Sequence, residues 1–446
     1  MQLVAYGAQD VYLTGQPKVT FFQAVYKRHT NFAMENIQQT VNGTPSPSGR
    51  VSVTIARNGD LVGDMYVALV PSSATMLTSN NAGYDTCWVA ERAIAAVELT
   101  IGGQRIDKHY QTWFRLYAEV FLSESDKINY GKLTSCANPL PSDGTNRCYV
   151  YLPLLFFFNR NPGLFLPLIA LQYHEVRLDF DLTATFSSYF GSNSPVFEVW
   201  ANYVYLDTEE RRRFAQKGHE YLIEQVQHTG GDSITASGNP GAQTIRLSYN
   251  HPVKELIWCY QNTTSTATNS MWNFSTSAQN VNVTVNTHPT VSYSALPHTL
   301  GAPRLFSNIA PASTTAGTLT SNIGWVEEGT SNTTTAASCE VGPLYNFKLV
   351  LNGQDRFKEQ IGKYFNQYQP YVYHSGTPYP GIYVYSFALQ PEEHQPTGTC
   401  NFSRIDNAQV AINMKSGYST PLQKMFAVNY NILRIQSGMG GLAFSN

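Results

Sequence analysis

The sequence contains an internal repeat whose two copies lie 250 positions apart. Residues 97–108 and 347–358 each read as a strand, a glycine turn and the start of an aromatic-rich segment. A second correspondence joins Asn202–Leu206 to Asn429–Leu433. Solenoid units recur every ~20–50 residues, so this much longer separation predicts two copies of a whole domain. The identical positions of the first match are Leu99/Leu349, Gly103/Gly353, Gln104/Gln354 and Lys108/Lys358.

A third, weaker match pairs Val62–Val67 with Val253–Trp258, 191 positions apart. Between this match and the glycine turn, the second half therefore has 59 more residues than the first. The surplus falls in residues 262–338, which contain three charged side chains where average composition gives ~19. The strand-like stretch Val281–Val285 and several aromatic residues favour an ordered surface excursion over a disordered linker. The first half has 23 more residues after its glycine turn, which we expect around residues 139–161.

Short alternating apolar and polar stretches dominate both halves and predict an all-β chain of sandwiches or barrels. Two helices are expected, one within Lys108–Phe121 and a short one at Thr208–Phe214 that connects the halves. The apolar run Tyr149–Leu171 is interpreted as two buried strands and a turn. Because Asn-Gly favours tight hairpins, Arg57–Asp60 is expected to form a hairpin turn.

The charge composition limits the possible partners. Charged residues make up 13% of the chain and the net charge is −2, so direct nucleic-acid binding, which needs a basic face, is not expected.

The N-terminus has no signal-peptide pattern, and no apolar run reaches the ~20 residues of a membrane span. Six scattered cysteines are expected to be buried thiols, although a Cys136–Cys148 bridge stays possible.

The sequence has no motif for catalysis, cofactor binding or structural zinc, and we predict no enzyme activity, no cofactor and no metal. His394 beside Glu392 and Glu393 is the single local cluster of histidine and acids, and a solvated loop is favoured over a metal site. Four carboxylates were weighed as a glycosidase pair and are expected to be structural: Asp60, Asp64, Asp179 and Asp181.

Six Asn-x-Ser/Thr triplets are candidate glycosylation sites. Two of them, Asn42 and Asn401, lie outside the charge-poor segment and carry no prediction. The other four fall within residues 262–338, where we expect any glycans: Asn262, Asn273, Asn282 and Asn332.

Several longer motifs resemble the major capsid proteins of nucleocytoplasmic large DNA viruses. They occur in family order from residue 2 to residue 446, so the resemblance covers nearly the whole chain, with none of them in 262–338. The matching stretches are Gln2–Gly15, Phe21–Phe32, Arg57–Leu61, Asp207–Phe214, His219–Glu224, His251–Trp258 and Leu433–Asn446.

The resemblance implies a double jelly roll, that is, two tandem eight-stranded antiparallel sandwiches. On this basis we expect an N-terminal arm (1–24), a first jelly roll (25–207), a connector (208–224) and a second jelly roll (225–446). The insertion at about 262–338 would project outward as a surface loop.

The resemblance also implies a homotrimeric, pseudo-hexagonal capsomer that self-assembles into an icosahedral virion shell in the host cytoplasm. Expected partners are copies of the chain, neighbouring capsomers and minor capsid proteins, with the internal membrane reached through the arm and host surface glycans reached through outer loops. The alternatives are a minor or penton-associated capsid paralogue and a glycan-binding jelly-roll module. A two-domain hydrolase is the least favoured interpretation.

Overall fold

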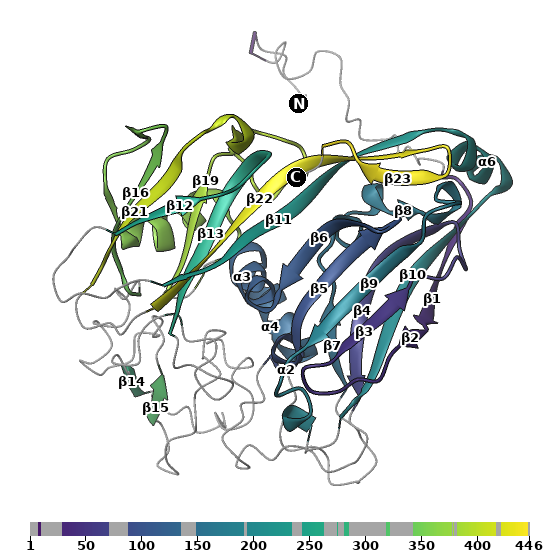
Figure 1. Ribbon diagram of the computed structural model, residues 1–446, viewed down its shortest axis with the longest axis horizontal. Helices are drawn as coiled ribbons and strands as arrows, with labels where there is room; N and C mark the ends of the chain where they lie inside the picture. Colours follow the sequence, from purple (N-terminus) through teal and green to yellow (C-terminus); the bar gives the residue numbers. More distant parts are fainter. Residues whose placement is uncertain are drawn as a thin grey trace, which may run out of the picture.

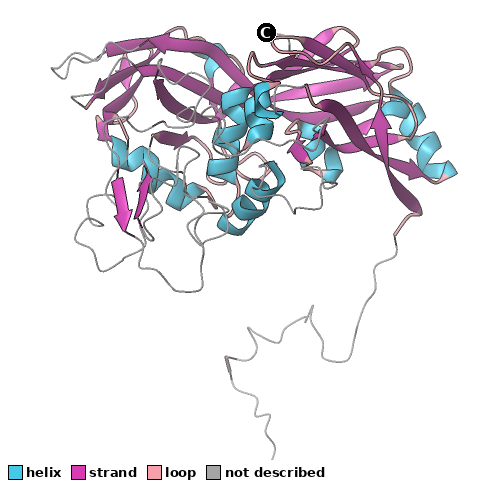
Figure 2. Cartoon of the chain, turned by 90° about the horizontal axis from the view of Figure 1, so that it is seen from below, coloured by secondary structure: helices cyan, strands magenta, loops and turns pink. Residues whose placement is uncertain are grey.

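The computed structural model describes two β-sandwiches lying side by side, with helices where they meet (Figures 1 and 2). No described helix is long and apolar enough to cross a bilayer. The described residues are 8–9, 29–70, 88–134, 149–190, 194–233, 243–262, 274, 281–284, 318–321, 342–376, 378, 381–415 and 421–444.

The first sandwich consists of two antiparallel sheets. One has the order β1-β10-β4-β7, with β8 beside β4, and the other has the order β2-β3-β9-β5-β6. Their strands are β1 (Phe32–Gln39), β2 (Val41–Asn42), β3 (Arg50–Thr54), β4 (Leu61–Val70), β5 (Ile94–Ile101), β6 (Gln104–Tyr110), β7 (Val150–Pro153), β8 (Leu166–Pro167), β9 (Val176–Leu182) and β10 (Val196–Leu206).

The second sandwich follows the same plan. One sheet has the order β11-β22-β13-β19, with β20 on β13 and β23 on β22, and the other has the order β12-β21-β16-β17, with β18 on β16. These strands are β11 (His219–Ser233), β12 (Gln243–Leu247), β13 (Pro252–Asn262), β16 (Leu344–Leu351), β17 (Gln354–Asp355), β18 (Gln360–Ile361), β19 (Ile382–Ser386), β20 (Cys400–Asn401), β21 (Ala408–Met414), β22 (Pro421–Gln436) and β23 (Met439–Leu442).

The two sandwiches correspond strand by strand, which confirms the all-β double-sandwich fold. β1, β10, β4 and β7 occupy the places that β11, β22, β13 and β19 occupy in the second sandwich. The repeated turn is also the same, because Gly102 and Gly103 have φ of 57° and 81°, while Asn352 and Gly353 have 51° and 77°. Two successive residues with positive φ define a tight hairpin turn that favours Gly and Asn, which is why this part of the repeat is conserved between the two halves.

The helices are concentrated near the contact between the sandwiches. α3 (Gln111–Phe121) and α4 (Glu124–Thr134) follow β6, whereas the π-helical turn η4 (Tyr364–Tyr368) and α7 (Gln369–Tyr373) occupy the matching place after β17. The remaining helices are α2 (Val89–Ala93), α5 (Phe157–Arg160) and α6 (Thr208–Gln216), with short 3-10 turns at Pro162–Leu164, Leu168–Ala170, Ser188–Phe190 and Phe402–Arg404.

The sheet β11-β22-β13-β19 is buried on both faces. Trp258 and Tyr383 face the core of the second sandwich, whereas Ile257 and Val384 belong to a core shared with the first. Every residue from Val253 to Tyr260 is consequently buried. A strand covered on both faces lacks the alternation expected where one face meets water, and its two charged residues, Lys254 and Glu255, are buried beside partners of opposite charge.

One local expectation was incomplete and one was wrong, whereas the helix expected within Lys108–Phe121 is confirmed. Within Tyr149–Leu171, only β7 and the two-residue β8 are strands, and Phe157–Arg160 is helical. Arg57–Asp60 does not close a hairpin, because β3 and β4 belong to different sheets. In Lys108–Phe121, β6 continues through Tyr110, so the helix begins at Gln111.

In the insertion, the described strands β14 (Val281–Thr284) and β15 (Thr318–Ser321) pair antiparallel. The predicted N-terminal arm, residues 1–24, lies outside the described residues apart from positions 8 and 9.

Candidate functional site: the junction between the two sandwiches

Helix α3 supplies the aromatic surface of the first sandwich that contacts the second. Trp113, Tyr117 and Phe121 are spaced four residues apart, so their side chains form one stripe along the helix. The ring of Trp113 lies 5.6 Å from that of Phe426 in β22, and Phe121 lies 5.2 Å from His374. The stripe therefore packs against the outer face of the sheet β11-β22-β13-β19 at Phe426 and against the end of α7 at His374.

Three hydrogen bonds from polar groups of the second sandwich reach the first across this junction. The side-chain amide of Gln225 donates to the carbonyl of Ile106, and the backbone N–H of Val226 donates to Asp107 Oδ1 at 3.1 Å. Lys424 Nζ donates to Thr112 Oγ1 at 3.2 Å. Leaving a buried polar group unpaired costs free energy, so these bonds favour one alignment of the two sandwiches over shifted ones.

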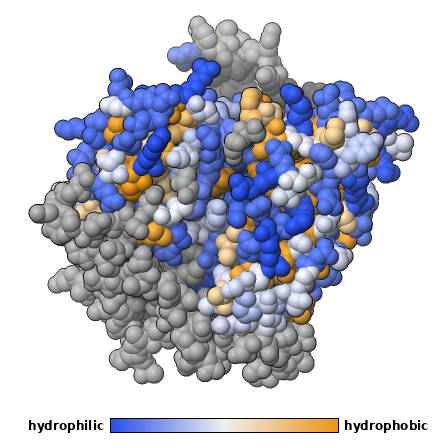
Figure 3. Space-filling model, in the orientation of Figure 1, coloured by the Kyte–Doolittle hydropathy of each residue, from blue (hydrophilic) through white to orange (hydrophobic). Residues whose placement is uncertain are grey.

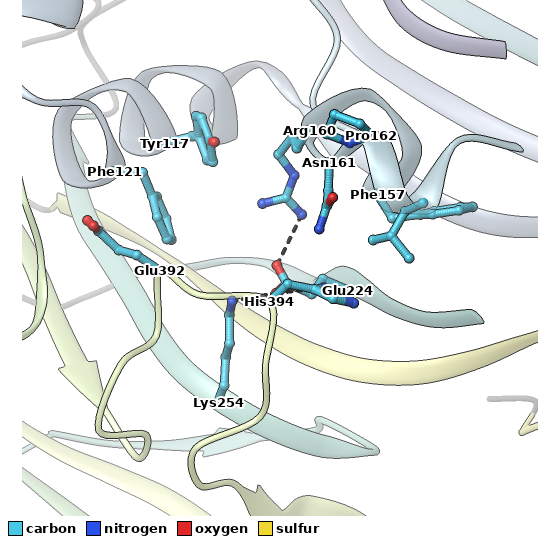
Figure 4. A pocket seen from close by; sticks show the side chains of 11 residues that line it. Tyr117, Phe121, Phe157, Arg160, Asn161, Pro162, Glu224, Lys254, Glu392 and His394 are labelled. Carbon is cyan, nitrogen blue, oxygen red and sulfur yellow. Dashed lines mark hydrogen bonds and ion pairs between the residues drawn. The ribbon is translucent and has the colours of Figure 1, made fainter. Parts of the chain in front are cut away.

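A buried carboxylate, Glu224 of β11, is the centre of an ionic cluster (Figure 4). Its oxygens lie 2.8 Å from Lys254 Nζ, 3.1 Å from Arg160 Nη2 and 3.8 Å from His394 Nδ1. Burial alone would raise the pKa of Glu224, but His394, Lys254 and Arg160 outweigh it and lower the pKa to about 2. Glu224 is thus ionised at neutral pH and links β11 and β13 to helix α5 of the first sandwich.

This cluster borders a cavity of about 250 Å³. Figure 4 shows Tyr117 and Phe121 of α3 on one side and the loop carrying Glu392 and His394 on another. Arg160 also lies over the ring of Tyr117, with 5.7 Å between the guanidinium and the ring centroid. The charged groups in the cavity wall are already engaged with one another.

A second buried ion pair lies beside the first. His374 Nε2 is 3.1 Å from Glu255 Oε2, and His374 Nδ1 is 3.4 Å from Glu392 Oε1. Burial lowers the pKa of His374, but the two carboxylates outweigh it and raise the pKa to about 9. The same interactions lower the pKa of Glu392 against the effect of its burial. His374 is therefore a cation at neutral pH.

The acidic residues singled out in the sequence have structural partners. His394 faces Glu224 rather than forming a cluster with Glu392 and Glu393, and no group of metal-ligating side chains is found in the described part of the chain. Asp179 pairs with Arg50 at 3.4 Å and with Arg177 at 2.8 Å. These contacts favour structural ion pairs over acid–base chemistry.

The connecting helix α6 is attached to the first sandwich by one of its three arginines. Arg211 Nε lies 3.0 Å from Asp60 Oδ1, and the other oxygen of Asp60 accepts the N–H of Leu206. Arg212 instead pairs with Glu209 within the helix at 3.4 Å.

The predicted glycosylation sites are only partly within the described residues. Asn262 is the last residue of β13 and Asn282 lies in β14. Asn273 and Asn332 lie outside the described residues, as do Cys136 and Cys148. Cys259 and Cys400 are free thiols.

The sequence did not reveal the junction residues as a group. Glu224, Lys254 and Arg160 come from three separate elements, and no local spacing brings them together. Only one indirect indication pointed to these residues: Glu224 and Lys254 lie in stretches that resemble the capsid family, His219–Glu224 and His251–Trp258.

Comparison with protein families gives two adjoining matches. Residues 20–207 match a model described as major capsid protein N-terminus, and residues 210–441 match one described as large eukaryotic DNA virus major capsid protein. The chain is 43% identical to the major capsid protein of Paramecium bursaria Chlorella virus 1, covering 100% of this chain and 99% of that protein. It is 39% identical to the major capsid protein of Phaeocystis pouchetii virus, with the same coverage.

Solved structures agree with this assignment. The chain matches a subunit of the PBCV-1 virus capsid quasi-atomic model with a TM-score of 0.73 and 38% identity, covering 96% of this chain and 100% of the other. The Faustovirus major capsid protein, at 14% identity, shares the fold with a TM-score of 0.63, covering 97% of this chain and 94% of the other. The chain belongs to the major capsid protein family of large eukaryotic DNA viruses, and it is a structural, non-enzymatic component of the virion capsid that self-associates into capsomers.

Proposed function

We propose that three copies of the chain form a pseudo-hexagonal capsomer, and that these capsomers tile an icosahedral shell. The observation that supports this most directly is the strand-by-strand correspondence of the two sandwiches. A trimer of such chains presents six similar units, and closed symmetry lets one kind of interface serve all three subunits.

The surface is compatible with many weak contacts between capsomers. Figure 3 shows hydrophobic and hydrophilic residues interspersed over both sandwiches, and the net charge of −2 gives little repulsion between copies. Contacts that are individually weak become stable when many form together.

In this proposal, residues 25–207 and 225–446 are the two jelly rolls, 1–24 is an arm and 208–224 connects the jelly rolls. The last part of this connector, His219–Glu224, already pairs with β22 as the start of β11. The arm contacts minor capsid proteins and the internal membrane, whereas the insertion at 262–338 faces outward. Glycans on Asn262, Asn273, Asn282 or Asn332 lie on this outer surface. The same surface contacts glycans of the host. Mass spectrometry of virion-derived protein tests the four sites, and unmodified asparagines at all four would contradict this part.

The trimer is tested by light scattering of the purified protein. We expect a mass of about 149 kDa, three times the 49.6 kDa of one chain. A strictly monomeric protein across micromolar concentrations would contradict the proposal, because a capsomer must exist before a shell can be built from it.

A further inference from the structure

The cavity at the junction has an apolar wall that comes from the first sandwich. Tyr117 and Phe121 of α3 stack there with their ring centroids 4.8 Å apart, and the buried side chains of Phe157 and Leu164 extend the wall. An apolar cavity of about 150 Å³ holds a benzene ring, so the volume of about 250 Å³ found here leaves room for about ten non-hydrogen atoms. This is the size of a small organic molecule.

The polar wall of the cavity is rich in hydrogen-bond donors. The guanidinium of Arg160 donates to Glu224, and the ammonium of Lys254 donates to Glu224 at 2.8 Å and to the carbonyl of Pro391 at 2.7 Å. A guanidinium and an ammonium have more N–H groups than these bonds occupy. The side-chain oxygen of Asn161 accepts a backbone N–H at 2.9 Å, while its NH₂ group has no hydrogen-bond partner among the residues that the structure describes. Figure 4 shows Arg160 and Asn161 side by side, both pointing toward the space between α3 and Glu224.

The charges at this end of the cavity do not balance. Arg160 and Lys254 are both paired with the single carboxylate of Glu224, at 3.1 and 2.8 Å. The pKa of Glu224 is lowered to about 2, so this group contributes one negative charge against two positive ones at neutral pH. Spare donors and an excess positive charge in a half-buried site favour an anionic ligand.

The other carboxylate of the wall, Glu392, is neutralised where it stands. It accepts the backbone N–H of Ser375 at 2.8 Å and the hydroxyl of Ser375 at 3.0 Å, and it lies 3.4 Å from the cationic ring of His374. In Figure 4 it lies near Phe121, away from Asn161. An anion bound at the Arg160 end therefore does not meet an uncompensated carboxylate.

We propose that this cavity binds a small organic carboxylate with an apolar body. The carboxylate accepts hydrogen bonds from Arg160 and Asn161, and the body packs on Tyr117 and Phe121. The wall is formed by α3 and the Arg160 turn of the first sandwich and by β11, β13 and the His394 loop of the second, so the ligand links the two sandwiches. A ligand that binds only the folded chain stabilises it. All these contacts lie within one chain, so the site is independent of the proposed trimer.

Titration calorimetry of the unmodified protein tests the chemistry of the site. The probe is 3-phenylpropionate, which has about the number of atoms that the cavity holds. We expect saturable binding of one molecule per chain and a melting temperature that rises with its concentration. Three matched compounds separate the contributions: 3-phenylpropanamide and 3-phenylpropylamine replace the carboxylate, and propionate lacks the ring. The amide and the amine should bind roughly tenfold to a hundredfold more weakly, because they lose the charge-assisted bonds to Arg160. Propionate should also bind more weakly, because it buries less apolar surface.

Two variants place the binding in this cavity. Arg160→Gln should weaken 3-phenylpropionate binding roughly tenfold or more. The matched control is Arg434→Gln, since Arg434 also pairs with a glutamate, Glu220, at 2.8 Å but lies outside the cavity wall, and its affinity should be unchanged. Leu164→Phe puts a larger side chain into the cavity wall and should abolish binding.

Three results would overturn the proposal. The first is no binding of 3-phenylpropionate up to about 20 mM, well above the range of a specific small-molecule site. The second is equal affinity for the carboxylate and the amine, which would show that the site does not select an anion. The third is unchanged affinity in Leu164→Phe, which would place the binding elsewhere on the chain. The comparison of ligands uses the unmodified protein, so it decides the question even if Arg160→Gln fails to fold.

Discussion

At the scale of single residues, the buried ion pair of His374 and Glu255 links stability to pH. The pKa of His374 in the folded chain is about 9, above its ordinary value of 6.5. A raised pKa stabilises the fold fully below pH ~6.5, and this stabilisation is lost as the pH rises through about 9. We expect the melting temperature to fall between about pH 7 and 9.5. The double variant His374→Gln/Glu255→Gln should show a flatter profile, and an equal slope in both proteins would contradict this assignment.

The cluster around Glu224 predicts a strong effect of removing one cation. Lys254 is 1% exposed, and its ammonium neutralises a carboxylate that is also buried. Breaking one partner of a buried pair costs about 3–5 kcal/mol, because the other charge remains without full compensation. Lys254→Met should therefore lower the free energy of unfolding by about 3 kcal/mol in urea titrations. Adding Glu224→Gln should recover part of the loss, and a purely additive double variant would argue against direct coupling.

At the scale of elements, α3 connects the two sandwiches through a few large side chains. Trp113 is 2% exposed and packs on Phe426. Replacing a buried Trp by Ala costs about 3–5 kcal/mol through lost burial and the cavity that remains. Trp113→Ala should lower the free energy of unfolding by about that amount. Tyr371→Ala, at a residue that is 87% exposed on α7, should change it by less than ~0.5 kcal/mol in the monomer.

The sequence predicted some elements well because their patterns were local. The repeated turn, the strands around it and the connector at Thr208 were visible in spacing and turn chemistry alone. The run Tyr149–Leu171 was misread because short apolar stretches suit a buried strand and a buried helix equally. The junction was not predictable in this way, since Glu224 meets Arg160 across 64 positions and Lys424 meets Thr112 across 312.

At the scale of the whole molecule, one hydrophobic core extends across both sandwiches. Phe426, Ile257 and Val384 of the second sandwich belong to the same buried cluster as the core of the first, whereas Phe347 belongs to the separate core of the second. Chains of several domains often unfold in separate steps. A shared core opposes this, because unfolding either sandwich exposes apolar surface on the other.

We therefore expect one calorimetric unfolding transition for the chain. Phe347→Ala should lower the temperature of this single transition, because loosening one sandwich loosens both. Phe426→Ala should do more, separating the transition into two, since it removes a contact that couples the sandwiches. Limited proteolysis provides an independent measurement, and it should release one protected half only in the Phe426→Ala protein. Two transitions in the parent, with only the second shifted by Phe347→Ala, would show that the junction holds two independent domains together without coupling their folding.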